Sequence, residues 1–326
     1  MDFFNGFSPS NGYFTVILIF SVIFFNGATD AVNAVATCVG TKCLKISHAV
    51  ILSAVFNFLG VFIMGIFSSG VAYTVKNLAF FPNDTVCRTA LCASMLSVII
   101  WTVFTWIFGI PTSESHALVS SLAGTALAYA GSYINAEEYS KVLYGLIVST
   151  VMGFCAGILS NQAVRLIFKS KSDNFFRFAQ IFGACISSFA HGAQDGLKFL
   201  GLFLLFSSDE NSIGIWLVLA VSFVMFAGTA VGGKKIIRSV GEDMIPLEKC
   251  DGFASDIASA VCLLSASVWG IPTSTTHTKT SSVLGAGILN GGKINFKTVF
   301  GIVTAWILTF PLCTLLGYLI MKIILK

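Results

Sequence analysis

The stretch Asn26-Gly27-Ala28-Thr29-Asp30 places an acid in the middle of the first long apolar segment of the chain. A charged side chain inside a membrane is costly unless a partner or a bound cation neutralises it. The stretch His191-Gly192-Ala193-Gln194-Asp195 repeats the Gly-Ala-x-Asp pattern 165 positions later (195 − 30). We therefore expect the two stretches to be equivalent parts of a duplicated chain.

A second motif is repeated at nearly the same distance. Gly-Ile-Pro-Thr-Ser-x-x-His occurs at residues 109–116 and returns at residues 270–277, which is 161 positions later (270 − 109). The two offsets are close, so they indicate one duplication in which each copy kept both motifs. The predicted division is a first transmembrane repeat over residues 1–168, a cytoplasmic linker over 169–174 and a second, inverted repeat over 175–326.

The composition is that of an integral membrane protein. Of the 326 residues, 56% are hydrophobic and 10% are charged, and the mean hydropathy is +0.87, whereas soluble domains are roughly 25% charged. The net charge of +4 is small, so nothing supports nucleic-acid binding, and the lipid bilayer is the expected surrounding. The loops are too short for a soluble catalytic domain, so we expect neither an enzyme nor a resident cofactor.

Ten apolar segments, five in each half, approach the roughly 20 residues that span a bilayer. The first and the sixth are longer and contain the Gly-Ala-x-Asp motifs, so each predicts a helix that is broken near the middle of the membrane. The ninth is short and predicts a half-helix or a re-entrant piece. The segments lie at 13–41, 46–69, 85–109, 117–134, 142–168, 175–206, 213–233, 251–270, 277–290 and 298–325.

Because each half has an odd number of segments, the second half enters the membrane in the opposite orientation to the first. The two halves are then related by a pseudo-two-fold axis in the membrane plane. The expected fold is an all-α polytopic membrane protein, an inverted repeat of two five-segment halves with broken helices, or of more segments if hairpins re-enter. Lys and Arg accumulate in cytoplasmic loops, and strict alternation puts the basic loops on one side. The other side receives Glu137, Glu138, Asp209 and Glu210. Both termini are therefore predicted to be extracytoplasmic.

The Pro-Thr-Ser motif predicts a chain reversal followed by a new helix. Proline suits the first turn of a helix, and serine and threonine are strong N-caps. Two facing helix N-termini would offer N–H groups and partial positive charge to a small tetrahedral oxyanion. The alternative is that the hydroxyls only cap kinked helices. The hydroxyls are those of Thr112, Ser113, Ser115, Thr273, Ser274, Thr275 and Thr276.

The two acids predict a cation site beside this anion site. Unwound backbone next to Asp30 and Asp195 would offer hard oxygen ligands, which suit an alkali cation or a proton. Asn33 follows Asp30 by one helical turn, and Lys198 follows Asp195 by one turn. Asn33 is expected either to bind the cation or to hold the neighbouring backbone by hydrogen bonds. A pair between Lys198 and Asp195 is the structural alternative to a cation at that acid.

Four further positions keep more than one interpretation. Glu114 is replaced by Thr275 in the second copy, and a gate, a cation ligand or an acid favoured by the helix dipole would all fit it. Lys279 would either balance the anion or extend to the membrane interface. Thr29 and Gln194 occupy the same place in their repeats, and each can reach either ion.

With these motifs, the chain resembles the inorganic phosphate transporter (PiT) family of secondary transporters. The resemblance covers essentially the whole chain, because both halves carry both motifs in the family's order. It implies symport of phosphate with Na⁺ or H⁺, an inverted repeat, both termini outside the cell membrane, and a homodimer.

The resemblance also implies roles for single residues. It places the cation with Asp30, Asn33 and Asp195, and Asn26 and Thr29 of the first motif are further candidate cation ligands in this sequence. It places phosphate with Thr112, Ser113, Ser115, Ser274, Thr275 and Thr276, with Gln194 nearby. Glu114, Lys198 and Lys279 are candidates for a gate or for charge balance. The chain departs from the family where Thr29 and Gln194 stand in place of the usual Asn before each acid.

We expect a secondary active transporter that imports inorganic phosphate with Na⁺ or H⁺ by alternating access, with Na⁺ at Asp30 and Asp195. A transporter of sulfate or a related oxyanion is one alternative, although only phosphate can donate a proton to a carboxylate at neutral pH. A phosphate-responsive anion channel or receptor is an alternative from a different class of protein. Concentrative uptake would exclude the channel.

Overall fold

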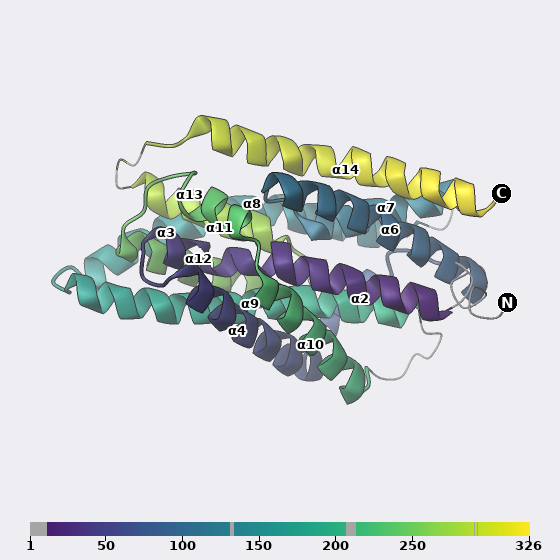
Figure 1. Cartoon of the computed structure of the whole chain (residues 1–326), viewed down its shortest axis with the longest axis horizontal. Coiled ribbons are helices and arrows are strands. Elements are labelled where there is room, and N and C mark those ends of the chain that lie inside the picture. The colour runs from purple at the N-terminus through teal and green to yellow at the C-terminus, as the bar shows by residue number, and fades with distance from the viewer. Residues whose placement is uncertain (1–11, 131–133, 207–212, 290, 292) are drawn as a thin grey trace.

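The computed structural model describes residues 12–130, 134–206, 213–289, 291 and 293–326. In these ranges the chain forms helices and no β-strand, and the long helices run roughly along the longest axis of the molecule (Figure 1). The predicted all-α polytopic fold is confirmed. Asp209 and Glu210, which we expected in an acidic loop, lie outside the described residues.

The helices occur in the same order in both halves. The first half contains α2 (Gly12–Thr29), the 3₁₀ helix η1 (Ala31–Val35), α3 (Ala36–Gly40), α4 (Ile46–Phe67), α5 (Gly70–Lys76), α6 (Asp84–Phe108), α7 (Glu114–Tyr129) and α8 (Ala136–Ile167). The second half contains α9 (Asp173–Phe206), α10 (Ile215–Val231), α11 (Lys234–Gly241), α12 (Lys249–Val268), α13 (Thr275–Ile288) and α14 (Phe296–Ile324). The short helices α5 and α11 are equivalent to each other, and the apolar pattern did not predict either of them.

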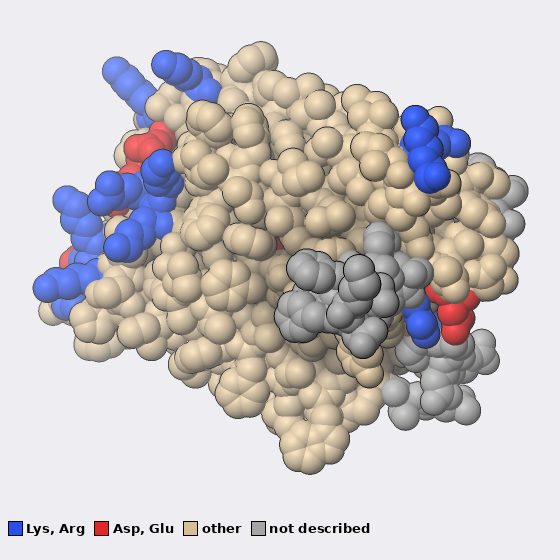
Figure 2. Space-filling view, turned by 45° about the vertical axis from the view of Figure 1, so that its right-hand side comes forward, with Lys and Arg blue, Asp and Glu red and all other residues tan. Residues whose placement is uncertain are grey.

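The two halves face opposite ends of the bundle. The hairpin of α6 and α7 lies toward the end where α2 begins and α14 ends, and the hairpin of α12 and α13 lies toward the other end (Figure 1). The connections α3–α4, α8–α9 and α13–α14 also meet at this second end. Figure 2 shows Lys and Arg side chains gathered there. The bundle therefore has one strongly basic end.

Among the described residues, six helices are long and apolar enough to cross a membrane, or seven if α10 and α11, bent by 75°, form one span. The six are Gly12–Gly40, Ile46–Phe67, Asp84–Phe108, Ala136–Ile167, Lys249–Val268 and Phe296–Ile324. With 16 residues in α7 and 14 in α13, both are shorter than the roughly 20 residues of a full span. The half-helix predicted for the ninth segment is confirmed, and the fourth segment is a half-helix as well.

The first helix is broken at its motif, whereas the sixth is not. α2 ends at Thr29, and the backbone N–H of Asn33 donates to the carbonyl of Asp30 at 3.0 Å in the 3₁₀ turn that follows. α9 is one helix of 34 residues that continues through the second motif, so the break predicted there is wrong. Lys198 pairs with Asp195 from the next turn of the same helix. The carboxylate is thus satisfied without an opened backbone.

The glycines of the two motifs allow close helix crossings. A Cβ atom at Gly27 would lie 2.6 Å from the carbonyl oxygen of Met225 in α10, and one at Gly192 would overlap the carbonyl oxygen of Asn57 in α4. Helices approach this closely only where a residue has no side chain. Each motif is therefore held against a long helix, α2 against α10 and α9 against α4.

Candidate functional site

Each Pro-Thr-Ser motif forms the tip of a helical hairpin, as its sequence predicts. Gly109 and Gly270 reverse the chain with φ angles of 68° and 71°, in the left-handed region that favours glycine. Ser113 and Ser274 then cap α7 and α13, and each hydroxyl oxygen accepts a hydrogen bond, of 3.3 and 3.1 Å, from a backbone N–H one turn later. These serines are helix caps whose O–H groups remain able to donate.

The two hairpin tips meet each other in the interior. The hydroxyl of Ser115 in α7 donates to the carbonyl oxygen of Thr273, just before α13, at 3.4 Å. The rings of His116 and His277, which occupy equivalent positions, contact each other edge to face with centroids 4.2 Å apart. The N-termini of α7 and α13 therefore converge, and hydroxyls from both halves lie around one place.

Asp30 joins both hairpins at the break after α2. Its side chain is buried, and its carboxylate accepts the backbone N–H of Glu114 at 3.2 Å. The same carboxylate accepts the hydroxyl of Thr276. Glu114 begins α7 and Thr276 belongs to α13, so this acid connects the tips of the two repeats.

Glu114 is a second buried acid beside Asp30. Its Oε1 accepts the hydroxyl of Thr29 at 2.9 Å, and its Oε2 has no hydrogen-bond partner among the described residues. In the same part of the chain, Oδ1 of Asn26 and both amide atoms of Asn33 are buried and equally unpartnered. Unpartnered buried oxygens are costly unless an ion or water uses them. Oxygens of this kind are suitable ligands for Na⁺, and a carboxylate can hold a proton.

Asp195 is paired within its own helix. Its Oδ1 lies 2.8 Å from Nζ of Lys198, and its Oδ2 accepts the hydroxyl of Thr275 at 3.2 Å. Nζ of Lys198 also donates to the hydroxyl oxygen of Ser115 at 2.6 Å. The ammonium is buried, and it connects the acid of α9 with the opposite hairpin.

Two other predicted residues hold the hairpin turns. Nε2 of Gln194 donates to the carbonyl of Ile271 at 2.9 Å and to the hydroxyl of Thr273 at 2.8 Å. The hydroxyls of Thr112 and Thr105 lie 3.2 Å apart and tie the first hairpin together. In this structure Gln194 positions the backbone before α13, and its amide protons are directed to that turn.

The sequence did not predict a second buried ion pair, between Lys279 of α13 and Asp256 of α12. Thr37 of α3 donates to the same carboxylate at 2.7 Å. Because Lys279 is fully buried, it does not extend to the membrane interface. A sequence signal was available, since Asp256 is an acid within an apolar segment whose equivalent in the first half (256 − 161) is Met95.

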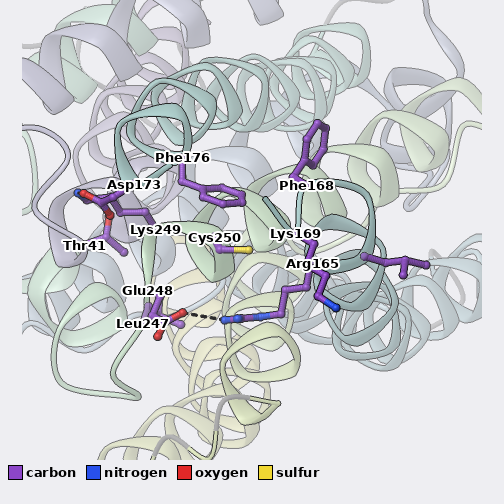
Figure 3. Close-up of a pocket in the computed structure, with 11 residues that line it drawn as sticks. Thr41, Arg165, Phe168, Lys169, Asp173, Phe176, Leu247, Glu248, Lys249 and Cys250 are labelled. Carbon is purple, nitrogen blue, oxygen red and sulfur yellow. Dashed lines mark hydrogen bonds and ion pairs between the residues drawn. The ribbon is translucent and has the colours of Figure 1, made fainter. Parts of the chain in front are cut away.

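A cleft of about 820 Å³ is lined by Arg165, Lys169, Lys249 and neighbouring residues (Figure 3), and the α8–α9 connection beside it lies at the basic end of the bundle (Figure 1). Four of its charged side chains pair with one another, Arg165 with Glu248 at 2.9 Å and Lys249 with Asp173. No motif residue lines this cleft. We therefore place the candidate site at the hairpin tips.

The candidate site is closed on all sides. None of the motif side chains that form it is more than 7% exposed. An ion or a small anion can therefore reach it only after helices or hairpins move.

Known proteins with similar sequences and folds point to one family. The sequence profile of the phosphate transporter family matches the chain twice, over residues 26–173 and 160–317. A probable low-affinity inorganic phosphate transporter of Bacillus subtilis is 35% identical over 93% of this chain and 93% of its own. A protein of the same description from Rhizobium meliloti is 32% identical over 94% of each chain. A solved structure described as the sodium-dependent phosphate transporter shares the fold, with a TM-score of 0.83 over 95% of this chain and 97% of that one at 21% identity.

Proposed function

The chain belongs to the phosphate transporter family, whose members transport and do not catalyse, and we propose that it imports inorganic phosphate together with Na⁺ or H⁺ by alternating access. One observation carries this proposal. Two hydroxyl-ringed helix N-termini converge on the buried acids Asp30 and Asp195. Helix N-termini attract an anion, and an acid attracts a cation, so one enclosed place suits both ions.

Phosphate is assigned to the N-termini of α7 and α13. Free N–H groups of the first turns and the hydroxyls around them can donate to its oxygens. The hydroxyls assigned to it are those of Thr112, Ser113, Ser115, Ser274, Thr275 and Thr276. Gln194 supports this arrangement through the turn before α13.

The transported cation is assigned to Asp30 and Glu114, with Asn26, Asn33 and Thr29 around them. The support is the set of buried, unpartnered oxygens in this part of the chain. Two neighbouring buried acids repel each other when both are ionised, so a cation or a proton stabilises them. Cation binding then raises the affinity for phosphate, and phosphate raises that for the cation by the same factor.

Uptake into proteoliposomes tests the proposal. Purified protein is reconstituted, and labelled phosphate uptake is followed with an inward Na⁺ gradient, an inward H⁺ gradient, or neither. The sodium in the description of the similar structure makes Na⁺ the first cation to test. Concentrative uptake driven by one gradient supports symport, and the absence of uptake under every gradient would refute it.

Sulfate transport is the competing function with the same fold. Phosphate carries a proton at neutral pH and can donate a hydrogen bond to a buried carboxylate at the hairpin tips, whereas sulfate cannot. We therefore expect excess sulfate to leave phosphate uptake nearly unchanged. Strong competition by sulfate would favour the oxyanion alternative, and uptake that only equilibrates phosphate would favour a channel.

We also propose that the protein lies in the plasma membrane with its basic end in the cytoplasm. Lys and Arg accumulate on the cytoplasmic side of membrane proteins, and the basic end is opposite the end where α2 begins and α14 ends (Figures 1 and 2). A cleavable tag added after Lys326 is expected to be cut from outside intact cells. A homodimer is proposed from the family resemblance alone, and light scattering of the purified protein tests it.

A further inference from the structure

The repeat offers an internal control for the role of Lys198. The offset that aligns Asp195 with Asp30 aligns Lys198 with Asn33 (198 − 33 is 165, as is 195 − 30). The two acids are therefore equivalent, while the residue one turn later is a cation in one repeat and a neutral amide in the other.

In the second repeat the ammonium connects an acid and a hydroxyl. Nζ of Lys198 lies 2.8 Å from Oδ1 of Asp195 and 2.6 Å from Oγ of Ser115. An ammonium has three N–H donors, so a third remains for an oxygen of a bound anion. Asp195 and Lys198 together are neutral before any ion enters from solution.

In the first repeat no ammonium occupies the equivalent place. Among the described residues, no Lys or Arg lies within ion-pair distance of Asp30, and both amide atoms of the fully buried Asn33 lack partners. This repeat also carries an extra acid, because Glu114 stands where the second repeat has Thr275 (275 − 114 is 161). The first repeat thus has two acids and no fixed cation, and the second has one acid with a fixed cation.

We propose that the ammonium of Lys198 is a tethered cation that takes, at Asp195, the place that a transported cation takes at Asp30. Buried charge must be paired, and the side chain of Lys198 does this without dissociating. A tethered cation is not released on the other side of the membrane in each cycle. Lys198 therefore sets the coupling ratio, and the protein moves one cation fewer with each phosphate than it would with an amide at this position.

This inference rests on the proposed symport, and the experiment is the ratio of cation flux to phosphate flux in proteoliposomes, measured with the cation that drives the wild type. Lys198→Asn copies the first repeat and is expected to raise the ratio by one cation. Asn33→Lys copies the second repeat and is expected to lower it by one cation. Lys198→Arg keeps the fixed charge and should keep the wild-type ratio. Lys141→Asn removes an exposed, paired lysine at the start of α8 and is the control.

The outcomes separate the inference from the proposed function. If the wild type transports phosphate with the cation and folded Lys198→Asn has the same ratio of cation flux to phosphate flux, the inference is wrong while the proposed symport stands. If Lys198→Asn folds but does not transport, its affinity for phosphate is measured at increasing cation concentrations. The inference is wrong if this affinity rises no more steeply with cation concentration than that of the wild type. If Lys198→Asn does not fold, Asn33→Lys decides, and an unchanged ratio there overturns it. A wild type without cation-driven uptake refutes the proposed symport itself.

Discussion

The two Gly-Ala-x-Asp motifs share their acid and their glycine but differ in backbone and partner. In the first, the helix ends at Thr29, and Asp30 faces two hairpin tips and has no Lys or Arg partner within the described part of the chain. In the second, α9 continues without a break and Asp195 pairs with Lys198. Duplication thus preserved the position of the acid but not how its charge is balanced.

The two hairpins show the same kind of difference. α12 and α13 enclose the pair Asp256 and Lys279, which Thr37 joins. The equivalent positions in the other half are Met95, Leu118 and Leu202 (256 − 161, 279 − 161 and 37 + 165), and all three lie in one apolar cluster. An apolar cluster in the first half therefore takes the place of the ion pair in the second half. Because these contacts differ, we do not expect the two hairpins to move equally easily.

The largest effect on transport is expected at Asp30, the acid that has no lysine partner among the described residues. Asp30→Asn should lower cation-driven phosphate uptake by roughly 100-fold, near the upper range of the coupling between two ligands, because the cation then loses a charged ligand. Uptake into proteoliposomes measures this. Asp84→Asn, which changes an exposed acid at the start of α6, is the control, and normal coupling in Asp30→Asn would remove Asp30 from the cation site.

The acid with a lysine partner is expected to matter for stability as well. Asp195→Asn leaves the buried ammonium of Lys198 unpaired and should cost about 3–5 kcal/mol of unfolding free energy. Asp30→Asn should lower the unfolding free energy much less, because it leaves no buried lysine without its partner. Thermal unfolding in detergent compares the two variants. The double variant Asp195→Asn with Lys198→Asn should regain most of the loss, and equal losses in both single variants would show that the two acids are structurally alike.

The second buried pair can be converted to the apolar arrangement of the other hairpin. Lys279→Leu alone should cost about 3–5 kcal/mol, because Asp256 stays buried without its ammonium. Adding Asp256→Met should restore stability to within about 1 kcal/mol, as replacement of a buried pair by apolar residues often does. A double-mutant cycle on unfolding gives the interaction energy. Additive losses would show that the pair is not coupled.

The smallest effect is expected at the helix caps. Ser274→Ala and Asn83→Ala each remove a capping oxygen, from α13 and α6 respectively, and each should cost about 1 kcal/mol of stability. Only Ser274→Ala should also raise the phosphate concentration for half-maximal uptake, because only this cap adjoins the proposed anion site. An equal effect of both variants on phosphate affinity would leave Ser274 with a structural role alone.

Much of the site could be predicted from local sequence. The turns at Gly109 and Gly270 and the caps at Ser113 and Ser274 depend on φ angles and hydrogen bonds within a few residues, so their motifs suffice. The motif alone predicts a break in α9, and this prediction is wrong because a Gly-Ala-x-Asp stretch is also compatible with a continuous helix. Lys198 lies one turn after Asp195 and pairs with it, so the carboxylate is neutralised within an unbroken helix and no break is required.

The amino-acid sequence identifies a membrane protein with a duplicated core, two acids in apolar helices and two hydroxyl-rich helix starts. Composition and short-range spacing carry this information, because burial and capping act on neighbouring residues. Which of these groups meet in space follows from the folded arrangement of the helices. Thr276 reaches Asp30 and Ser115 reaches Lys198 from the opposite repeat, and Asp256 joins Thr37 and Lys279. Such contacts depend on how whole helices cross. These crossings are controlled by glycines that lie far from the contacting residues in the sequence.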